Sequence, residues 1–515
     1  MASCYFKFLR RFVSNSGDLL IDKCLLNARM CHLMSSNFYS SKSPINLNEN
    51  ENPFKKTFRI FADDFKDMKN VMLGRAKVLK SPKFPTHCDV IIIGGGVMGF
   101  SIAYWLQQRA LEGLKIIVVE KDPSVKSGNF SNLEYSKSTT ALSVGGIRQQ
   151  FSLKENIELS LYSAEFLRNI KHHLSIKGED PPSVDFNPAG YLFLASEKHV
   201  QRVIDNVNLQ TSLGAKVELL SPEKLKEKFP WLNTDGVAIA SHGLENEGWF
   251  DPWLLLQAFK RKAISLGVQF IPGEVTKFGF DDESNVIGDD LFPKYDSLKK
   301  VFVKLPDGTE KSINFAICII AAGAMSGEIG SLAGMGTGIG LRSPSLPVVP
   351  RKRYVHVLHC PDGPGMNTPV LIDYTGAYLR REGIGGNYVC GISPPEAEEP
   401  SVDNLNVEEN YFEEKVWPII AHRAPVFEKC KLTNSWAGFY DFNEFDENAF
   451  VGPHPGYNNL YLATGFSGHG IQQAPAIGRA FMEMIVDGQF NTIDLSRLGF
   501  QRYIEDKPLW ESNIV

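Results

Sequence analysis

The chain has 515 residues, 43% of them hydrophobic and 22% charged, which is the balance of an ordinary soluble globular protein long enough for several domains. Its formal net charge of −5 at pH 7 gives no whole-molecule attraction to nucleic acid, so we expect no nucleic-acid partner. No run of about 20 apolar residues is free of helix breakers, which predicts that the chain has no transmembrane helix and leaves peripheral membrane attachment open.

The first 42 residues are basic, rich in serine and poor in acidic side chains. Only Asp18 and Asp22 are acidic, against six basic residues. Such a leader is typical of a mitochondrial transit peptide, and the alternative is a basic tail that carries no address. We therefore expect residues 1–42 to be a transit peptide and the protein to lie in the mitochondrial matrix or on the matrix face of the inner membrane. Residues 43–85 are polar and broken by prolines, which predicts a linker with one short helix near 65–79.

The clearest local pattern follows the linker. A β-branched apolar run at 89–93 leads into Gly94–Gly99, which has the spacing G-x-G-x-x-G. A helical pattern over 100–108 comes next, and a second apolar run at 115–119 ends on Glu120. This order of strand, glycine turn, helix, strand and acidic residue is typical of a dinucleotide-binding βαβ unit. The alternative is a glycine turn between packed elements.

Each glycine of this turn has a physical role in such a unit. Gly94 allows the tight turn, Gly96 lets a pyrophosphate approach the N–H groups of a helix N-terminus, and Gly99 lets helix and strand pack closely. Glu120 can accept hydrogen bonds from an adenosine ribose. The sequence therefore predicts an ADP-containing dinucleotide bound by Gly94, Gly95, Gly96, Val97, Met98, Gly99, Glu120 and Lys121.

Further elements alternate along the middle of the chain. A polar insert at 123–137 predicts a surface loop, and the segment 138–151 leads into a helix. Another helix begins with Asp251 as its N-cap and Pro252 in its first turn. Further strands are predicted at 190–194, 236–240, 268–271 and 316–320, a helix at 197–213, a loop at 281–300 and a hairpin over 301–315.

From Leu346 to about Phe442 the composition changes to strands and turns rich in Pro, Gly and Tyr. A second glycine cluster, Gly465–Gly470, then lies between a predicted strand at 460–463 and a predicted helix at 471–486. The cysteines are scattered without the spacing of metal ligands, so no metal site is predicted. These shifts predict a nucleotide-binding domain made of 86–185, 244–345 and 446–495, a substrate or partner domain made of 186–243 and 346–445, and a tail at 496–515.

The ordered set of motifs resembles one family. Gly94–Gly99, Ser143–Phe151, Gly248–Pro252, Ala321–Gly323 and Gly465–Gly470 together are similar to the D-amino-acid oxidase/sarcosine dehydrogenase family of flavoenzymes. The resemblance covers nearly all of the chain after the linker. It implies an α/β fold, in which a Rossmann-like FAD-binding domain of the glutathione-reductase type carries an inserted α+β, sheet-rich substrate domain.

Within this family the chain most resembles a mitochondrial member implicated in the assembly of respiratory complex I. The resemblance thus implies respiratory complex I subunits or assembly intermediates as partners, and an amino-acid-like small molecule as substrate. FAD would accept a hydride from the carbon next to the nitrogen of an N-alkyl or secondary amino acid, and water would hydrolyse the imine. The alternative is an assembly or binding factor that keeps FAD for structure or redox sensing, and a third reading is a nicotinamide dehydrogenase.

The resemblance also assigns site residues. The segment before Arg148 lies beside the flavin ring, and the Arg148 guanidinium could pair bidentately with a substrate carboxylate. The alternative for Arg148 is a surface or helix-start arginine in an ion pair. At the second glycine cluster a helix N-terminus would favour negative charge near the flavin ring, with His469 either a polar contact or an ordinary core or surface group. The further implied FAD contacts are Ser143, Gly145, Gly146, Val275, Ala322, Gly323, Gly465, Ser467, Gly468, His469, Gly470 and Ile471.

Tyr378 and Tyr440 match active-site tyrosines of related amine oxidases, and the alternative for both is aromatic packing in a sheet. Two departures from the family are informative. No histidine occurs over 138–146 and no cysteine directly before Tyr440, which predicts noncovalent FAD. No lysine occurs over 386–390, where related oxidases carry the lysine that activates oxygen, which predicts a dehydrogenase rather than an oxidase.

Overall fold

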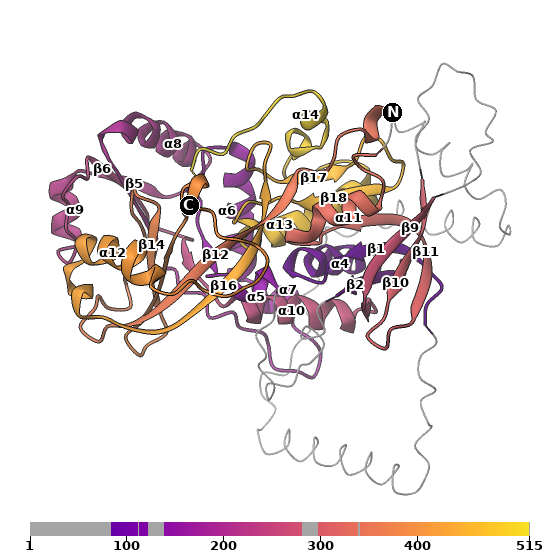
Figure 1. The fold of residues 1–515 in the computed structure, drawn as a ribbon, viewed down its shortest axis with the longest axis horizontal. Helices are drawn as coiled ribbons and strands as arrows, with labels where there is room; N and C mark the ends of the chain where they lie inside the picture. Colours follow the sequence, from indigo (N-terminus) through magenta and orange to yellow (C-terminus); the bar gives the residue numbers. More distant parts are fainter. Residues whose placement is uncertain (1–83, 112, 122–137, 281–296, 338–339, 514–515) are drawn as a thin grey trace, which may run out of the picture. The chain divides into compact units, whose positions relative to one another are not determined.

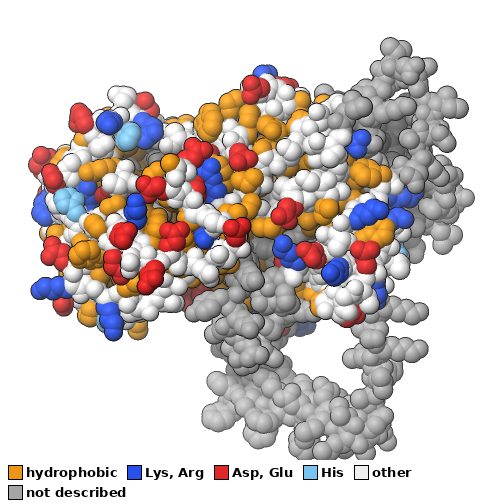
Figure 2. Space-filling model, in the orientation of Figure 1, with side chains coloured by type: hydrophobic (Ala, Val, Ile, Leu, Met, Phe, Trp, Pro, Cys, Tyr) orange, Lys and Arg blue, Asp and Glu red, His pale blue; other side chains and the backbone are white. Residues whose placement is uncertain are grey.

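Two eight-stranded β-sheets and the helices packed on them make up most of the residues that this computed structural model describes, which are 84–111, 113–121, 138–280, 297–337 and 340–513 (Figure 1). The predicted transit peptide, the predicted helix near 65–79 and the predicted loop at 123–137 lie outside these residues. None of the described helices combines the length and the apolar character that crossing a membrane requires. On the face drawn in Figure 2, acidic and basic side chains are interspersed.

The first sheet is centred on the β-branched run that precedes the first glycine turn. Its strand order is β17-β18-β11-β1-β2-β8, and β9 and β10 join it beside β11. Because β1 pairs in parallel with both β2 and β11, its residues Val90–Ile93 are buried on both faces. The strands are β1 (His87–Ile93), β2 (Ile116–Glu120), β8 (Gln269–Pro272), β9 (Glu274–Phe280), β10 (Leu298–Lys304), β11 (Glu310–Ile320), β17 (Phe450–Pro453) and β18 (Leu460–Thr464).

The strands of this sheet come from all three segments that the sequence assigns to nucleotide binding, although the domain boundaries themselves stay predictions.

The second sheet has the order β16-β12-β15-β14-β13-β4-β6-β5. Its pairs are antiparallel except for β13 and β4, which run parallel. The strands are β4 (Tyr191–Ala195), β5 (Val217–Leu220), β6 (Ile239–Gly243), β12 (Val348–His359), β13 (Val370–Ile372), β14 (Ala377–Glu382), β15 (Asn387–Ile392) and β16 (Lys431–Asn443).

Two helices that begin at the glycine clusters lie against each other (Figure 1). They are α4 (Val97–Ala110) and α13 (Gly470–Met482). Gly478 of α13 has no room for a side chain, because a Cβ there would clash with Ser101 of α4. Ser101 Oγ instead donates to the Ala474 carbonyl at 2.7 Å, and Trp105 Nε1 donates to the Pro475 carbonyl at 2.9 Å. These bonds satisfy carbonyl groups next to the proline inside α13 and set the spacing of the two helix starts.

The remaining helices surround these elements. The predicted N-cap of α10 is confirmed, since Asp251 accepts a hydrogen bond from the Leu254 N–H at 2.9 Å and Pro252 occupies the first turn. The helices are α5 (Thr139–Leu142), α6 (Lys154–Arg168), α7 (Ile170–Leu174), α8 (Val200–Ser212), α9 (Pro222–Lys228), α10 (Pro252–Ser265), α11 (Ser326–Leu332), α12 (Trp417–Arg423) and α14 (Gln501–Ile504).

Three predicted element boundaries are wrong. The strand expected at 236–240 begins only at Ile239, because Gly236 has a φ of +70° and belongs to a turn. The expected loop over 281–300 is too long, since Leu298 is buried and starts β10, which pairs with β9. The helix expected to reach residue 486 ends as an α-helix at Met482 and continues as the π-helical turn Glu483–Asp487.

Candidate functional site

A cavity of about 480 Å³ lies where the two glycine clusters meet. Its wall combines the starts of α4 and α13 with residues of β12, β14 and β16 from the second sheet. Of the residues predicted from the sequence, Gly95, Gly99, Gly145, Val275 and Gly465 do not line it. Those that do are Gly94, Gly96, Val97, Met98, Glu120, Lys121, Ser143, Gly146, Arg148, Ala322, Gly323, Tyr378, Tyr440, Ser467, Gly468, His469, Gly470 and Ile471.

The first glycine turn is held by close backbone contacts. Gly94 has a φ of +110°, and a Cβ there would clash with the carbonyl of Ala321 at the end of β11. A Cβ on Gly99 would clash with the carbonyl of Gly94. On Gly96, by contrast, a Cβ would meet only Thr140 Oγ1, at 3.3 Å, among the described atoms. The turn therefore needs glycine for its shape at two positions and leaves open space toward the cavity at the third.

The start of α4 carries hydrogen-bond donors toward this space. Gly96 is the N-cap residue and provides no side-chain cap, and the first turn contains no acidic residue. The Val97 N–H donates to Thr140 Oγ1 at 3.2 Å, and the Gly95 N–H donates to Glu120 Oε2 at 2.6 Å. The positive end of the helix dipole and the first-turn N–H groups, which have no acceptor within the helix, fit an anionic diphosphate. A carboxylate at the position of Glu120 is a hydrogen-bond acceptor suited to ribose hydroxyl groups.

Thr140 was not among the predicted residues. It lies in α5, 43 positions after Val97, and the only signal in the sequence is the run of hydroxyl side chains at 138–140. Val275 lies in β9, two residues after Gly273, whose N–H donates to the Glu120 carbonyl at 2.8 Å. Its role as a cofactor contact stays a prediction.

The second glycine turn is stabilised from behind by a buried carboxylate. Gly465 and Gly468 have φ values of +75° and +97°. Asp441 Oδ2 accepts the N–H groups of Gly465 and Phe466 at 2.8 and 3.0 Å. Burial raises the pKa of Asp441 to about 6, and these backbone donors only partly offset the effect. Asp441 lies in β16, so sequence patterns near the turn did not reveal it.

The start of α13 resembles that of α4 in its lack of a side-chain cap and of acidic residues in the first turn. Its N-cap residue, His469, is buried, and Nε2 makes no hydrogen bond among the described residues. Burial, assisted by the nearby charge of Arg148, lowers the pKa of His469 to about 3, so the imidazole is neutral. A buried orphan nitrogen beside an uncapped helix start fits a polar ring bound in the cavity.

The segment that precedes Arg148 is fixed by the Gly248–Pro252 motif. Gly146 in the short strand β3 (Gly146–Ile147) pairs with β7 (Gly248–Trp249), and the Phe250 N–H donates to the Gly145 carbonyl at 2.8 Å. Gly145 has a φ of +70°, and a Cβ there would clash with the Phe250 carbonyl. Two motifs about 100 residues apart therefore form one structural unit, of which Gly146 and Arg148 line the cavity.

Arg148 is buried, with 4% of its surface exposed. Its guanidinium donates to the main-chain carbonyls of Gln150 and Asn513, the latter at 2.6 Å, and lies 4.0 Å above the Phe151 ring. Among the described residues no carboxylate oxygen comes within ion-pair distance of it, so it is neither at the surface nor in an ion pair there. Burial lowers the pKa of Arg148, yet a guanidinium stays protonated in proteins. The cavity wall thus holds a positive charge that neutral groups orient.

The two predicted tyrosines face the same cavity from the second sheet. Tyr440 OH accepts from Arg353 Nη2 at 2.9 Å, and Arg353 pairs bidentately with Glu399 at 2.7 and 2.9 Å. Tyr378 OH makes no hydrogen bond within the described part of the chain, and burial raises its pKa. Tyr191, which the sequence did not single out, also lines the cavity, and burial raises its pKa to about 12. All three phenols are therefore neutral hydrogen-bonding groups.

Comparison with known proteins points to the family that the sequence motifs resemble. The family model described as FAD dependent oxidoreductase matches residues 89–484. The chain is 52% identical over 436 residues to FAD-dependent oxidoreductase domain-containing protein 1 of Xenopus laevis, covering 84% of this chain and 85% of that protein. Its Drosophila melanogaster homolog is 46% identical over 438 residues, with coverages of 84% and 82%.

Among solved structures, L-proline dehydrogenase from P. horikoshii superposes with a TM-score of 0.67 at 26% identity, covering 83% of this chain and all of that one. The predicted α/β fold and the predicted family are thereby confirmed. Two uncapped helix starts, a glycine cradle open toward the cavity and an orphan imidazole nitrogen fit the predicted cofactor. The chain therefore belongs to the FAD-dependent oxidoreductase family, and its cofactor is FAD.

Proposed function

We propose that this protein is a dehydrogenase of carboxylate-bearing amines, such as N-alkyl or secondary amino acids, with noncovalently bound FAD. The observation that carries the proposal is the Arg148 guanidinium, which is buried in the wall of the cavity without a carboxylate partner among the described residues. A desolvated cation of this kind favours an anionic ligand. The similarity to the L-proline dehydrogenase of P. horikoshii is consistent with such a substrate.

In this proposal Arg148 binds the substrate, and the two tyrosines orient it. Arg148 has five N–H groups, and those not used by main-chain carbonyls bind the substrate carboxylate. Tyr378 and Tyr440, which line the cavity from the second sheet, orient the substrate through neutral hydroxyl groups. A bound FAD supplies the two-electron acceptor for the hydride that leaves the carbon next to nitrogen.

The pKa values of the residues that line the cavity indicate which of them can accept a proton from the substrate. His469, with a pKa near 3, accepts hydrogen bonds but does not hold a proton in the neutral range. Burial raises the pKa values of the lining tyrosines, so none of them acts as a base at neutral pH. Asp441 also lines the cavity, but its Oδ2 is held by the N–H groups of Gly465 and Phe466. We therefore expect the substrate amine to enter in its neutral form, and the turnover rate at low substrate concentration to rise with pH toward the pKa of the free amine.

The test replaces Arg148 and compares a charged ligand with its neutral isostere. Cyclopentanecarboxylate and cyclopentanecarboxamide are titrated into the purified flavoprotein, and binding is followed by the change in flavin absorbance. Arg148→Met should weaken carboxylate binding about 10- to 100-fold, because charge-assisted hydrogen bonds contribute about 1.5–3 kcal/mol, and should leave carboxamide binding unchanged. Arg148→Lys should fall between the two, since lysine keeps the charge but not the fork.

The matched control is Arg109→Met, because the Arg109 side chain is 56% exposed and pairs with Asp487 outside the cavity. Flavin content and melting temperature confirm that each variant is folded. Wild-type protein that binds the two isosteres equally well would contradict the proposal.

The electron acceptor and the mode of FAD attachment are testable in the same preparation. Among the described residues that line the cavity the one lysine is Lys121, next to Glu120 at the end of β2. This arrangement supports electron transfer to a quinone, a flavoprotein or a complex rather than to oxygen. Hydrogen peroxide formed at the rate of substrate turnover would contradict the dehydrogenase assignment, and flavin that stays attached after denaturation would contradict noncovalent binding.

We also propose a mitochondrial location, in the matrix or on the matrix face of the inner membrane, and respiratory complex I subunits or assembly intermediates as partners. The support is the basic leader at 1–42 and the sequence resemblance described first. If the protein is chiefly an assembly factor, Arg148→Met should restore complex I assembly in cells that lack the wild-type protein. If the redox reaction is required, the same folded variant should fail.

A further inference from the structure

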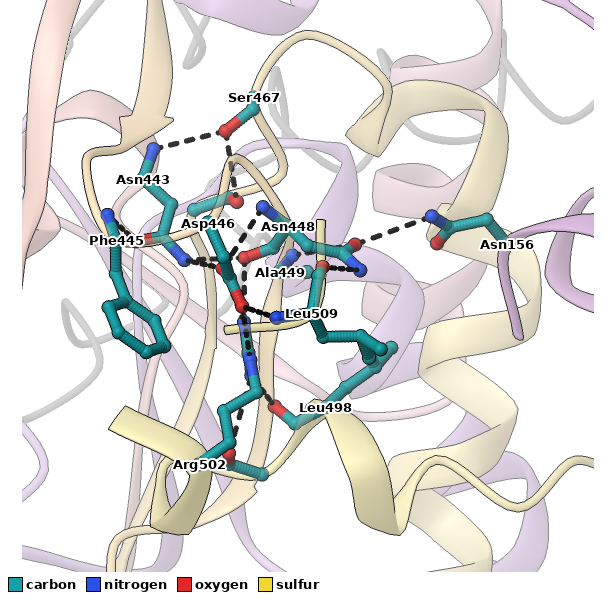
Figure 3. A network of polar contacts seen from close by, with 12 residues as sticks. Asn156, Asn443, Phe445, Asp446, Asn448, Ala449, Ser467, Leu498, Arg502 and Leu509 are labelled. Carbon is teal, nitrogen blue, oxygen red and sulfur yellow. Dashed lines mark hydrogen bonds and ion pairs between the residues drawn. The ribbon is translucent and has the colours of Figure 1, made fainter. Parts of the chain in front are cut away.

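The last described residues of the chain return from α14 to the wall of the cavity. We call residues 509–513 the C-terminal arm. Its first residue is anchored in a buried polar network, in which Asp446 accepts the Leu509 N–H at 2.9 Å and pairs with Arg502 Nε at 2.6 Å (Figure 3). Asn448 Nδ2 donates to the Leu509 carbonyl at 3.3 Å. The arm therefore leaves from a fixed point.

Glu511 joins the arm to the start of α6. It has only 4% of its surface exposed. One carboxylate oxygen accepts the N–H and the hydroxyl of Ser152 at 2.7 and 2.6 Å. The other accepts the Leu153 N–H at 3.2 Å and Asn156 Nδ2 at 3.0 Å. Leu153 is the N-cap residue and has no capping side chain, and the Glu511 carboxylate places negative charge at this helix N-terminus, where the helix dipole favours it.

Two residues further on, the arm reaches Arg148. The Asn513 carbonyl accepts from Arg148 Nη2 at 2.6 Å, and Asn513 Nδ2 donates to the Gln150 carbonyl at 2.6 Å. The Gln150 carbonyl also accepts from Arg148 Nη1. The guanidinium is thus oriented by two neutral carbonyls that are themselves joined through Asn513. The nearby carboxylate of Glu511 is occupied by five donors, the fifth being the Asn513 N–H of the arm itself at 3.0 Å.

We propose that the C-terminal arm is a positioning and specificity element of the carboxylate site. It holds the Arg148 guanidinium in place with neutral oxygens, so that the positive charge remains available to an anionic ligand. Glu511 is the positioning residue that keeps the arm docked. The inference rests on the proposed function of Arg148 and adds a requirement for a segment about 360 positions away in sequence.

The experiment uses the purified flavoprotein and a variant that ends after Trp510, with Glu511→Gln as a milder second variant should the truncated chain fold poorly. Glu511→Gln changes an acceptor into a donor that faces two other donors. The matched control is Glu505→Gln, which alters an exposed carboxylate in the same part of the chain that pairs only with its neighbours Lys507 and Gln501 among the described residues.

Two measurements are made on each protein. Amide hydrogen exchange at Ser152 and Leu153 reports whether the arm has left α6. Titration with cyclopentanecarboxylate and cyclopentanecarboxamide, followed by flavin absorbance, reports how the site discriminates charge. We expect faster exchange at both amides and a loss of about tenfold in carboxylate affinity, with carboxamide affinity and flavin content unchanged. The control should match the wild type.

The outcomes separate the two proposals. Faster exchange with an unchanged preference for the carboxylate, or an equal loss of both ligands, would overturn the role of the arm alone and leave the proposed function standing. Wild-type protein without any preference for the carboxylate would contradict the proposed function and, with it, the role of the arm. Unchanged exchange in both arm variants would show that Glu511 does not hold the arm.

Discussion

Alanine at Gly96 should abolish or greatly weaken FAD binding and leave the apoprotein folded, whereas alanine at Gly94 should destabilise the fold itself. The two glycines are two residues apart in the same turn, yet their surroundings differ. The backbone at Gly96 has a φ of −72°, which alanine adopts freely, and the new Cβ would meet only Thr140 Oγ1 at 3.3 Å. At Gly94 the φ of +110° is unfavourable for alanine, and the Cβ would clash with the Ala321 carbonyl.

The magnitudes follow from these contacts. For Gly96→Ala the entropic gain of about 0.4–1 kcal/mol from a stiffer unfolded chain offsets the tight contact, so the apoprotein's free energy of unfolding should change by less than about 1 kcal/mol. Its methyl group projects into the space where a diphosphate approaches the start of α4, and the loss of even one charge-assisted hydrogen bond weakens binding about 10- to 100-fold. For Gly94→Ala, backbone strain and overpacking each contribute about 1–3 kcal/mol to destabilisation.

Both quantities can be measured separately. Urea unfolding of the apoprotein gives the stability, and titration of the apoprotein with FAD gives the dissociation constant. If Gly96→Ala binds FAD within about twofold of the wild type, the diphosphate does not approach α4 at this residue. If Gly94→Ala unfolds at the wild-type urea concentration, the steric argument is wrong.

Three further changes probe the walls of the site. Thr140→Val removes the acceptor of the Val97 N–H and should cost about 1 kcal/mol in apoprotein stability by urea unfolding; an unchanged midpoint would show that the bond contributes nothing. Since burial raises the pKa of Asp441 to about 6, the unfolded chain loses this proton first, and the stability of the wild-type apoprotein relative to Asp441→Asn should fall by up to about 3 kcal/mol between about pH 4 and pH 6. Asp441→Asn keeps an oxygen for both backbone donors, and the comparison cancels the contribution of the buried histidines, so an identical pH dependence of both proteins would refute the assignment. Burial raises the pKa of Glu247 to about 7, so the stability of the wild type relative to Glu247→Gln should fall between about pH 5 and pH 7 in the same unfolding series.

The first βαβ unit could be predicted because its determinants are local. The β-branched run of β1, the glycine spacing at 94–99 and the acidic end of β2 lie within about 35 residues and each specify their own backbone shape. The same holds for the cap of α10, where Asp251 bonds an N–H three residues away. The predicted start of β10 was wrong because pairing with β9, and not a pattern within residues 298–300, makes this segment a strand.

The sequence by itself thus determined the cofactor class, through short-range periodicity, glycine spacing and the order of motifs. Only the tertiary structure decided what surrounds the guanidinium of Arg148, since its partner Asn513 is 365 positions away, and that Asp441 stabilises the second glycine turn from a different strand. The physical reason is that a pattern along the chain encodes contacts within one element. Hydrogen bonds between distant segments form only once packing has brought them together and removed the water that would otherwise satisfy them.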